Sequence, residues 1–154
     1  MFFISHRGNL NGKIPELENS PDYITNALQL GYNVEVDVWI YNGYFYLGHD
    51  WPQYPIDVSF LQNENIWCHA KHLEALESLL ENECHVFFHA NDPYTLTNKQ
   101  YIWSFPGHPI SASCIIVLPE LVPYYTENDI YSCSGICSDF IEIYRSKSSG
   151  VPKQ

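Results

Sequence analysis

The sequence of 154 residues has few basic side chains: Lys and Arg together number 7, against 18 Asp and Glu, for a formal net charge of −11. This charge repels a nucleic-acid backbone, and no basic stripe along the chain offsets it. We therefore expect no nucleic-acid partner. An acidic chain can still bind a phosphate group where a cation and a few positive side chains reverse the local charge.

Long apolar runs and a leader pattern are also missing. No run approaches the roughly 20 apolar residues that a membrane-spanning helix needs, so we expect no transmembrane segment. Residues 1–7 lack the basic start, apolar core and cleavage site of a signal peptide. The five cysteines are odd in number and lack paired zinc-ribbon spacing, which favours free thiols in a reducing compartment. Together these absences predict a cytoplasmic protein.

The composition is that of a folded domain. Hydrophobic residues make up 45% of the chain and aromatic residues 16%, which is typical of a globular protein. The length suits one domain with a sizeable core. We assign residues 1–145 to this domain and interpret 146–154 as a polar tail.

Short apolar or alternating runs dominate the chain and predict strands. The Asn42-Gly43 dipeptide predicts a two-residue hairpin turn, because both residues tolerate positive φ. In that hairpin Tyr41 pairs with Tyr44, and the second strand has to leave the ladder near Gly48 for His49 to approach the site. The predicted strands are 2–5, 34–40, 45–48, 66–70, 86–89, 101–104, 114–118 and 135–138.

Helices are fewer. Ser20-Pro21-Asp22 is typical of a helix start, and Gly31 of its end. A second helix is predicted over 73–83, and none beyond residue 90. Strand–helix–strand order near the start favours parallel pairing in an α/β fold. Three histidines are interpreted as surface residues: His72, His85 and His108.

Titratable side chains gather where predicted strands end. Glu35 and Asp37 lie two apart on one strand, so they project from the same face. Taken alone, this acidic pair fits a solvated strand face as well as a site. Four strands nevertheless finish with charged or titratable groups, and in a barrel such ends meet at one rim. The other strand-end groups are His6-Arg7, His49-Asp50, and His69 with Lys71.

In chain order these residues resemble a family signature. His6-Arg7-Gly8, Glu18-Asn19-Ser20 before a helix, Glu35-x-Asp37-Val38, and His49-Asp50 after a glycine turn are similar to the glycerophosphodiester phosphodiesterases, which belong to the phosphatidylinositol-phospholipase-C-like barrel phosphodiesterases. The resemblance covers residues 4–50 and is weaker over 66–139. It implies a compact, trimmed TIM-like (β/α) barrel, with several outer helices reduced to loops because eight full units need about 250 residues. Outer apolar faces left bare in this way predict a homo-oligomer.

The resemblance also implies roles for single residues. Glu35 and Asp37 match the family's metal-ligand pair, whose oxygen donors suit Mg²⁺ or Ca²⁺. His6 and His49 match its acid–base pair. Two positive residues, Arg7 and Lys71, match groups that bind the substrate phosphate.

Two departures from the family pattern bear on the site. His69 stands where the family has a third metal-binding carboxylate, so it is a candidate ligand that admits Zn²⁺ or Mn²⁺. Taken alone, such a histidine is more often a core residue than a ligand, and in this context the two interpretations carry equal weight. The alternative, which we favour for Mg²⁺, is a site of two carboxylates and water. Only residues 51–65 separate His49-Asp50 from the next strand, which leaves no room for the family's capping insertion and predicts an open site.

The resemblance, together with the strand-end groups, implies a metal-dependent phosphodiesterase that cleaves a small-molecule or lipid-derived phosphodiester through its two histidines, either by hydrolysis or by intramolecular transfer. The alternative is a non-catalytic module that binds phosphate or a phospholipid headgroup on the same fold. Trp103 and Phe105 are interpreted as core residues. Further candidates for the rim of the site are His89, Asn91, Glu120 and Asp139.

Overall fold

The computed structural model of the chain describes residues 1–148. Within these residues short helices are interspersed among the strands, and a single 3₁₀ turn, η1, follows the ninth strand. In chain order the elements are β1 (Phe2–His6), α1 (Pro21–Gln29), β2 (Asn33–Tyr41), β3 (Tyr44–Leu47), β4 (Tyr54–Ile56), α2 (Val58–Leu61), β5 (Ile66–Ala70), α3 (Leu73–Glu81), β6 (Val86–Phe88), β7 (Tyr94–Leu96), β8 (Ile102–Ser104), β9 (Cys114–Val117), η1 (Pro119–Leu121), α4 (Glu127–Ser132), β10 (Gly135–Ser138) and α5 (Ile141–Ser148).

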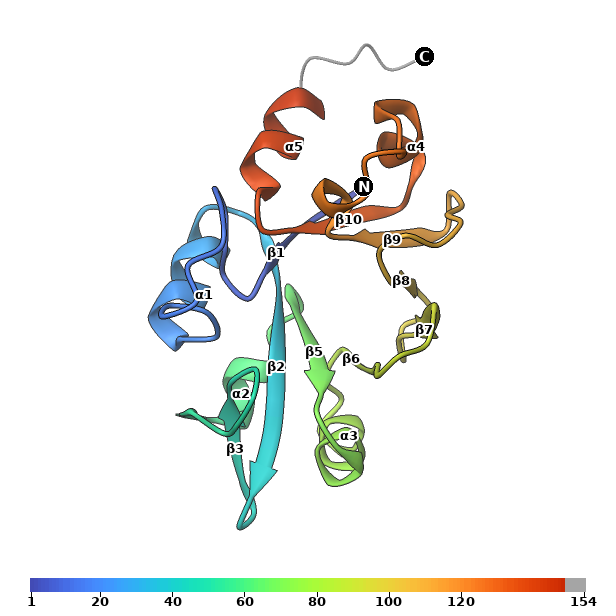
Figure 1. Cartoon of the computed structure of the whole chain (residues 1–154). Coiled ribbons are helices and arrows are strands. Elements are labelled where there is room, and N and C mark those ends of the chain that lie inside the picture. The colour runs from blue at the N-terminus through green and yellow to red at the C-terminus, as the bar shows by residue number, and fades with distance from the viewer. Residues whose placement is uncertain (149–154) are drawn as a thin grey trace.

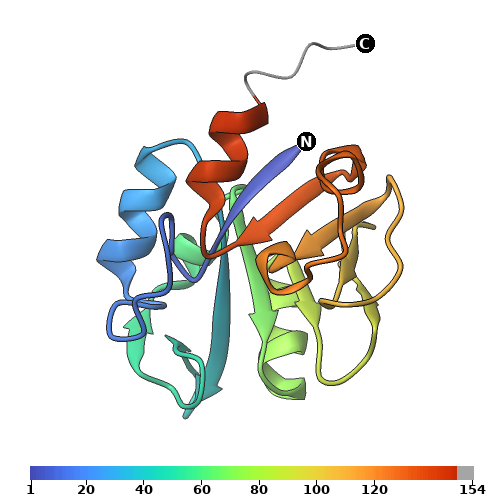
Figure 2. The same cartoon turned by 45° about the horizontal axis from the view of Figure 1, so that its top comes forward.

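All ten strands belong to one curled sheet. Seven of them pair in parallel in the order β6-β5-β2-β1-β10-β9-β8. The hairpin arm β3, followed by β4, continues antiparallel from the far half of β2, and β7 is antiparallel to β8 at the opposite edge. Figures 1 and 2 show the strands curving round in an arc, with the first strand lying between β2 and the last.

The predicted trimmed TIM-like (β/α) barrel is wrong, because the sheet is a half-barrel. No ladder in the described residues joins β6 to β7 or β8, although the Asn98 amide donates one bond to the Val86 carbonyl. A TIM barrel has eight parallel strands, each followed by a helix. Here no helix lies between β6 and β8, and the short edge strand β7 occupies that connection instead. The connection from β6 to β8 therefore lacks the helix that a closed (β/α) barrel has at this position.

Alternation along β2 divides the sheet into an outer apolar face and an inner mixed one. Val34, Val36 and Val38 point outward into a core that α1 and α3 cover. On the inner face, aromatic side chains fill the region beneath the site. Trp67, Phe87 and Trp103 belong to this buried cluster. The charged residues of the site therefore lie above an apolar floor.

The hairpin forms as predicted. Tyr41 pairs with Tyr44, β3 ends at Leu47, and the chain leaves the ladder at Gly48. Other local predictions were wrong. The prediction of no helix beyond residue 90 missed α4 and α5, although the capping box of Thr126 and Asp129 marks the start of α4. His85 is 4% exposed and is not a surface residue.

The end of the domain differs in detail from the predicted boundary. Helix α5 includes residues 146–148, which were assigned to a polar tail, and residues 149–154 lie outside the described part of the chain. Within residues 1–148, none of the helices has the length and apolar character needed to cross a bilayer. Self-association stays a prediction.

Candidate metal and phosphate site

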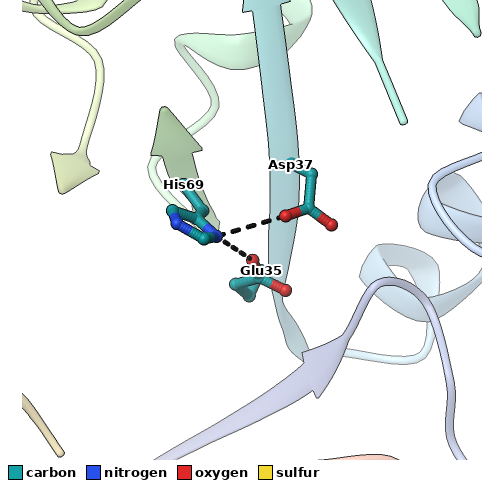
Figure 3. Close-up of side chains that lie close together, drawn as sticks. All are labelled: Glu35, Asp37 and His69. Carbon is teal, nitrogen blue, oxygen red and sulfur yellow. Dashed lines mark ion pairs between the residues drawn. The ribbon is translucent and has the colours of Figure 1, made fainter. Parts of the chain in front are cut away.

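The carboxyl ends of β1, β2 and β5 bring predicted site residues to one rim of the sheet. His6 is the register partner of Glu35, and Asp37 is the register partner of His69. Register partners on adjacent parallel strands point to the same face, so these four side chains face the inside of the half-barrel. Figure 3 shows Glu35, Asp37 and His69 converging from β2 and β5.

Glu35, Asp37 and His69 form a group that can hold a metal ion. One ligand atom from each residue lies within 4.8 Å of the other two. The Nδ1 atom of His69 is 3.1 Å from Asp37 Oδ1 and 3.8 Å from Glu35 Oε1, as the dashed lines in Figure 3 mark. Both carboxylates are buried, where a pair of negative charges is costly without a compensating cation or proton.

The other ring nitrogen of His69 determines what Nδ1 can do. Nε2 lies 3.0 Å from the backbone oxygen of His89. A carbonyl oxygen only accepts hydrogen bonds, so Nε2 carries a proton. Nδ1 then either carries a second proton and pairs with Asp37 as an imidazolium ion, or presents its lone pair to a metal ion. Backbone carbonyls commonly orient metal-binding histidines in this way.

Asp37 is the better compensated of the two carboxylates. Arg7 Nε lies 2.8 Å from Asp37 Oδ2, and Lys71 Nζ lies 3.1 Å from Oδ1. Asn19 donates to Oδ2 from its side chain and accepts the backbone amide of Asp37. Burial would raise the pKa of Asp37, but the His69 hydrogen bond and the charges of Arg7 and Lys71 hold that pKa well below its usual range.

Glu35 is less well compensated, since its two ion-pair contacts, to His6 and His69, are both 3.8 Å long. Its Oε2 atom is buried and has no hydrogen-bond partner among the described residues. The nearest imidazole nitrogen to that oxygen, His6 Nε2, is 3.8 Å away. Burial, followed by the charge of Asp37, raises the pKa of Glu35. A buried carboxylate oxygen without a partner, beside a second carboxylate and an oriented imidazole, fits a divalent cation.

His6 is held by a carboxylate on its far side. Its Nδ1 atom lies 2.7 Å from Asp139 Oδ1, which also accepts a hydrogen bond from Asn9. Burial would lower the pKa of His6, but the Asp139 hydrogen bond and the charge of Glu35 outweigh it and raise that pKa. Asp139 is fixed in turn by Glu120, which accepts its backbone amide. His6 therefore directs Nε2 toward Glu35 and the interior of the site.

Arg7 reaches the site from a left-handed turn. Its φ is 56°, which is uncommon for a residue other than glycine and occurs often at functional sites. The backbone amide of Arg7 donates to the Glu35 carbonyl, and Nη1 lies 3.2 Å from Glu18 Oε2. Asn19 donates its backbone amide to the Arg7 carbonyl. These contacts fix the guanidinium group beside the acidic pair.

His49 lies at the mouth of the site rather than within its hydrogen-bond network. Its Nδ1 atom is 2.7 Å from Asp50 Oδ1, and its side chain is 46% exposed. Partial burial and the nearby charge of Arg7 lower the pKa of His49. The Gly48 amide still donates to the Asp37 carbonyl, and the chain then leaves the ladder. His49, the next residue, lines the cavity.

A cavity of about 620 Å³ opens over this rim. Five of the seven predicted site residues line this cavity, and a sixth, Asp37, belongs to the metal-ligand group beside it. Lys71 faces Asp37 and does not line the cavity, so its predicted contact with phosphate stays a prediction. The cavity is lined by His6, Arg7, Lys13, Glu35, His49, His69, His89, Trp103, Phe105, Pro106, Val117, Leu118, Leu121 and Asp139.

Sequence reasoning missed several supporting residues. Asn9 is fully buried and joins Glu18 to Asp139 through its side-chain amide. Lys13 lines the cavity from the loop after β1 and has no ion-pair partner among the described residues. Asn9 and Lys13 lie in the irregular loop between β1 and α1. Without a helical or strand period, the sequence does not predict which way their side chains point. Phe105, predicted as core, is 46% exposed at the cavity wall.

Comparison with known proteins does not assign this chain to a family. No protein-family model, no curated protein and no solved structure matches it.

Proposed function

We propose that this protein is a metal-dependent phosphodiesterase, a phosphoric diester hydrolase of the kind that cleaves glycerophosphodiesters and related compounds. The observation that carries the proposal is the shared cavity. Its lining includes a buried carboxylate with one oxygen that makes no hydrogen bond, an oriented imidazole, a carboxylate-bound histidine and an arginine, which are Glu35, His69, His6 and Arg7. These groups supply anion binding and proton transfer at one place.

The ligands of the proposed cation are Glu35, Asp37 and His69. A divalent ion bound there would polarise a phosphoryl oxygen. Oxygen donors alone would favour Mg²⁺ or Ca²⁺, whereas an imidazole in the donor set favours Mn²⁺ or Zn²⁺. Since the His89 carbonyl leaves Nδ1 of His69 as the free nitrogen, we propose that the transition ions bind more tightly than Mg²⁺.

The remaining roles belong to positive and titratable side chains. Arg7 would bind phosphate oxygens and stabilise the negative charge that grows on them in the transition state. One of His6 and His49 would remove a proton from the attacking water, and the other would protonate the departing ester oxygen. Asp139 would keep His6 in the tautomer that carries its proton on Nδ1.

Turnover of an aryl phosphodiester such as bis(4-nitrophenyl) phosphate tests the proposal. The protein is assayed with Mg²⁺, Ca²⁺, Mn²⁺ and Zn²⁺ in turn. His6→Ala and His49→Ala should each lower kcat by at least about a hundredfold, because each removes a proton-transfer group. The matched control is His108→Ala, which lies outside the cavity and should leave turnover unchanged. Near-normal turnover in either cavity variant contradicts the assignment.

A binding module without turnover is the second candidate. Asp37 already bonds to Arg7, Lys71, Asn19 and His69, so much of the cluster can be stable without a metal ion. The same assay separates the two functions. Absence of turnover with all four ions, together with binding of inorganic phosphate by calorimetry, would favour the binding module.

A further inference from the structure

Two hollows meet at the phosphate-binding side of the site. A second cavity, of about 480 Å³, lies next to the one described above. The two share three residues: Arg7, Lys13 and His49. Two of these are cationic, and the third is a proposed proton-transfer group. A phosphodiester has two ester arms on opposite sides of phosphorus, so a phosphate bound at this junction would direct one arm into each cavity.

The walls of the two cavities differ in chemistry. Beyond the shared residues, the smaller cavity is lined mainly by hydrogen-bonding side chains, namely Glu16, Glu18, Asn19, Asp50 and Gln53, with Pro15 and Trp51. The larger cavity continues, past the histidines and acids of the site, into an apolar wall. That wall consists of Trp103, Phe105, Pro106, Val117, Leu118 and Leu121.

The side chains of the apolar wall are held in place by specific backbone and ring contacts. Leu118 has φ 45° and ψ 53°, a left-handed conformation that is rare for a bulky side chain. Its amide donates to the Cys137 carbonyl, and its carbonyl accepts the Leu121 amide. This turn brings both leucines to the cavity. Phe105 stacks on the His89 ring with centroids 5.1 Å apart and an interplanar angle of 14°.

Part of this wall is left open to solvent. Leu121 is 66% exposed and Phe105 is 46% exposed, and both line a cavity whose lining also includes the buried Trp103. Neighbouring exposed apolar side chains at a concave polar site mark a surface that binds an apolar ligand group. The smaller cavity has one exposed aromatic side chain, Trp51, at 59%, but five of the seven side chains that it does not share with the larger cavity carry carboxylate or amide groups.

We propose that the substrate is an asymmetric phosphodiester, with a hydroxylated alcohol arm on the His49–Gln53 side and an apolar alkyl arm on the Trp103–Leu121 side. This inference rests on the proposed function. In the reaction, the oxygen of water forms a bond to phosphorus, one phosphorus–oxygen ester bond breaks, and the departing alcohol takes up a proton. The products are a phosphomonoester and an alcohol. Each methylene that the apolar wall buries should improve binding roughly fourfold.

Two matched substrates test the inference. Glycerol methyl phosphate and glycerol octyl phosphate differ only in the length of the apolar arm, and the second is used below its micellar concentration. The octyl diester should have a kcat/KM at least about tenfold higher, since several methylenes are buried only in that complex. Equal kcat/KM for the two diesters, with both of them cleaved, overturns the inference and leaves the proposed function standing.

A pair of variants locates the effect. Leu121→Ser should reduce the octyl-to-methyl ratio of kcat/KM at least about threefold, and Phe105→Ser should act in the same direction. The matched control is Leu96→Ser, because Leu96 is 61% exposed but lies away from both cavities of the site. A ratio that falls equally in Leu96→Ser overturns the placement of the alkyl arm. Absence of cleavage for both diesters with every metal ion overturns the proposed function and this inference with it.

Discussion

Single residues in this protein are specialised by their surroundings rather than by their type. Glu35 and Asp37 are two residues apart on one strand. Asp37 is compensated by Arg7 and Lys71, whereas a buried oxygen of Glu35 has no hydrogen-bond partner among residues 1–148. Their pKa values are moved in opposite directions as a result. A pair of carboxylates treated so differently is typical of functional sites, where one member is left to bind a cation or a proton.

His69 is the residue at which the metal preference can be tested. We predict that His69→Glu, which replaces the imidazole by an oxygen donor, raises the affinity for Mg²⁺ relative to Mn²⁺ by at least about tenfold. Isothermal titration calorimetry of the metal-free protein measures both affinities without any substrate. Glu74→Gln, an acidic residue on the neighbouring helix α3, is the control and should leave the ratio unchanged. An unaltered ratio in His69→Glu would remove His69 from the ligand set.

The hairpin is the element that determines where His49 lies. β2 and β3 pair up to Leu47, and Gly48 then leaves the ladder with φ 152°. A Cβ atom at Gly48 would lie 2.2 Å from the backbone oxygen of Trp51, and backbone cannot give way as a flexible side chain can. The element therefore depends on one glycine to place a proposed catalytic histidine.

Gly48→Ala should consequently lower the stability of the fold by more than the strain of a positive φ alone. We expect it to lower the free energy of unfolding by about 2–3 kcal/mol and to reduce turnover, because the segment that carries His49 has to shift. The matched control is Gly43→Ala in the same hairpin, which also has positive φ but no atom within 4 Å of the added Cβ. Its cost should be about 1 kcal/mol. Urea unfolding measures both, and equal losses would contradict the steric argument.

At the scale of the whole molecule, the open sheet leaves apolar side chains uncovered at its edge. Leu80, Phe88 and Leu96 are all at least 42% exposed near β6 and β7, where the barrel fails to close. One histidine near that edge is nevertheless buried. His85 lies against the Trp67 ring, with centroids 4.1 Å apart, and Nε2 contacts the Thr97 hydroxyl.

The burial of His85 couples the stability of the fold to pH. Burial, followed by the positive charge of Lys99, lowers the pKa of His85 to about 4. The unfolded chain, with a pKa near 6.5, binds a proton first as the pH falls, so stability is full above about pH 6.5 and is lost toward pH 4. After solvent screening the loss should be about 2 kcal/mol.

His85→Gln removes this titrating group. Urea unfolding at several pH values should show a smaller loss of stability between pH 7 and pH 4 in the variant than in the wild-type chain. The other titratable groups, His6 and Glu35 among them, are the same in both proteins, so the difference between the two curves isolates His85. Parallel curves would show that the imidazole takes up its proton equally well in the folded state.

The sequence predicted local structure correctly where adjacent residues in the chain determine it. Asn42-Gly43 predicted the hairpin and its register, and Ser20-Pro21-Asp22 predicted the start of α1. The ordered motifs also predicted the residues that meet at the site, because parallel strands place their carboxyl ends at one rim. Helices α4 and α5 were missed since their apolar stripes are short and interrupted.

The sequence by itself determined which residues have the chemistry: an acidic pair on one strand, histidines at strand ends, and an arginine after the first strand. Only the tertiary structure decided whether the sheet closes, because closure depends on strands from opposite ends of the chain finding partners. The tertiary structure also decided that the Asp139 carboxylate hydrogen-bonds to His6 and that the His89 carbonyl orients His69. It likewise left one oxygen of Glu35 without a hydrogen-bond partner among the described residues. Each of these depends on contacts between residues far apart in the chain, which no local pattern encodes.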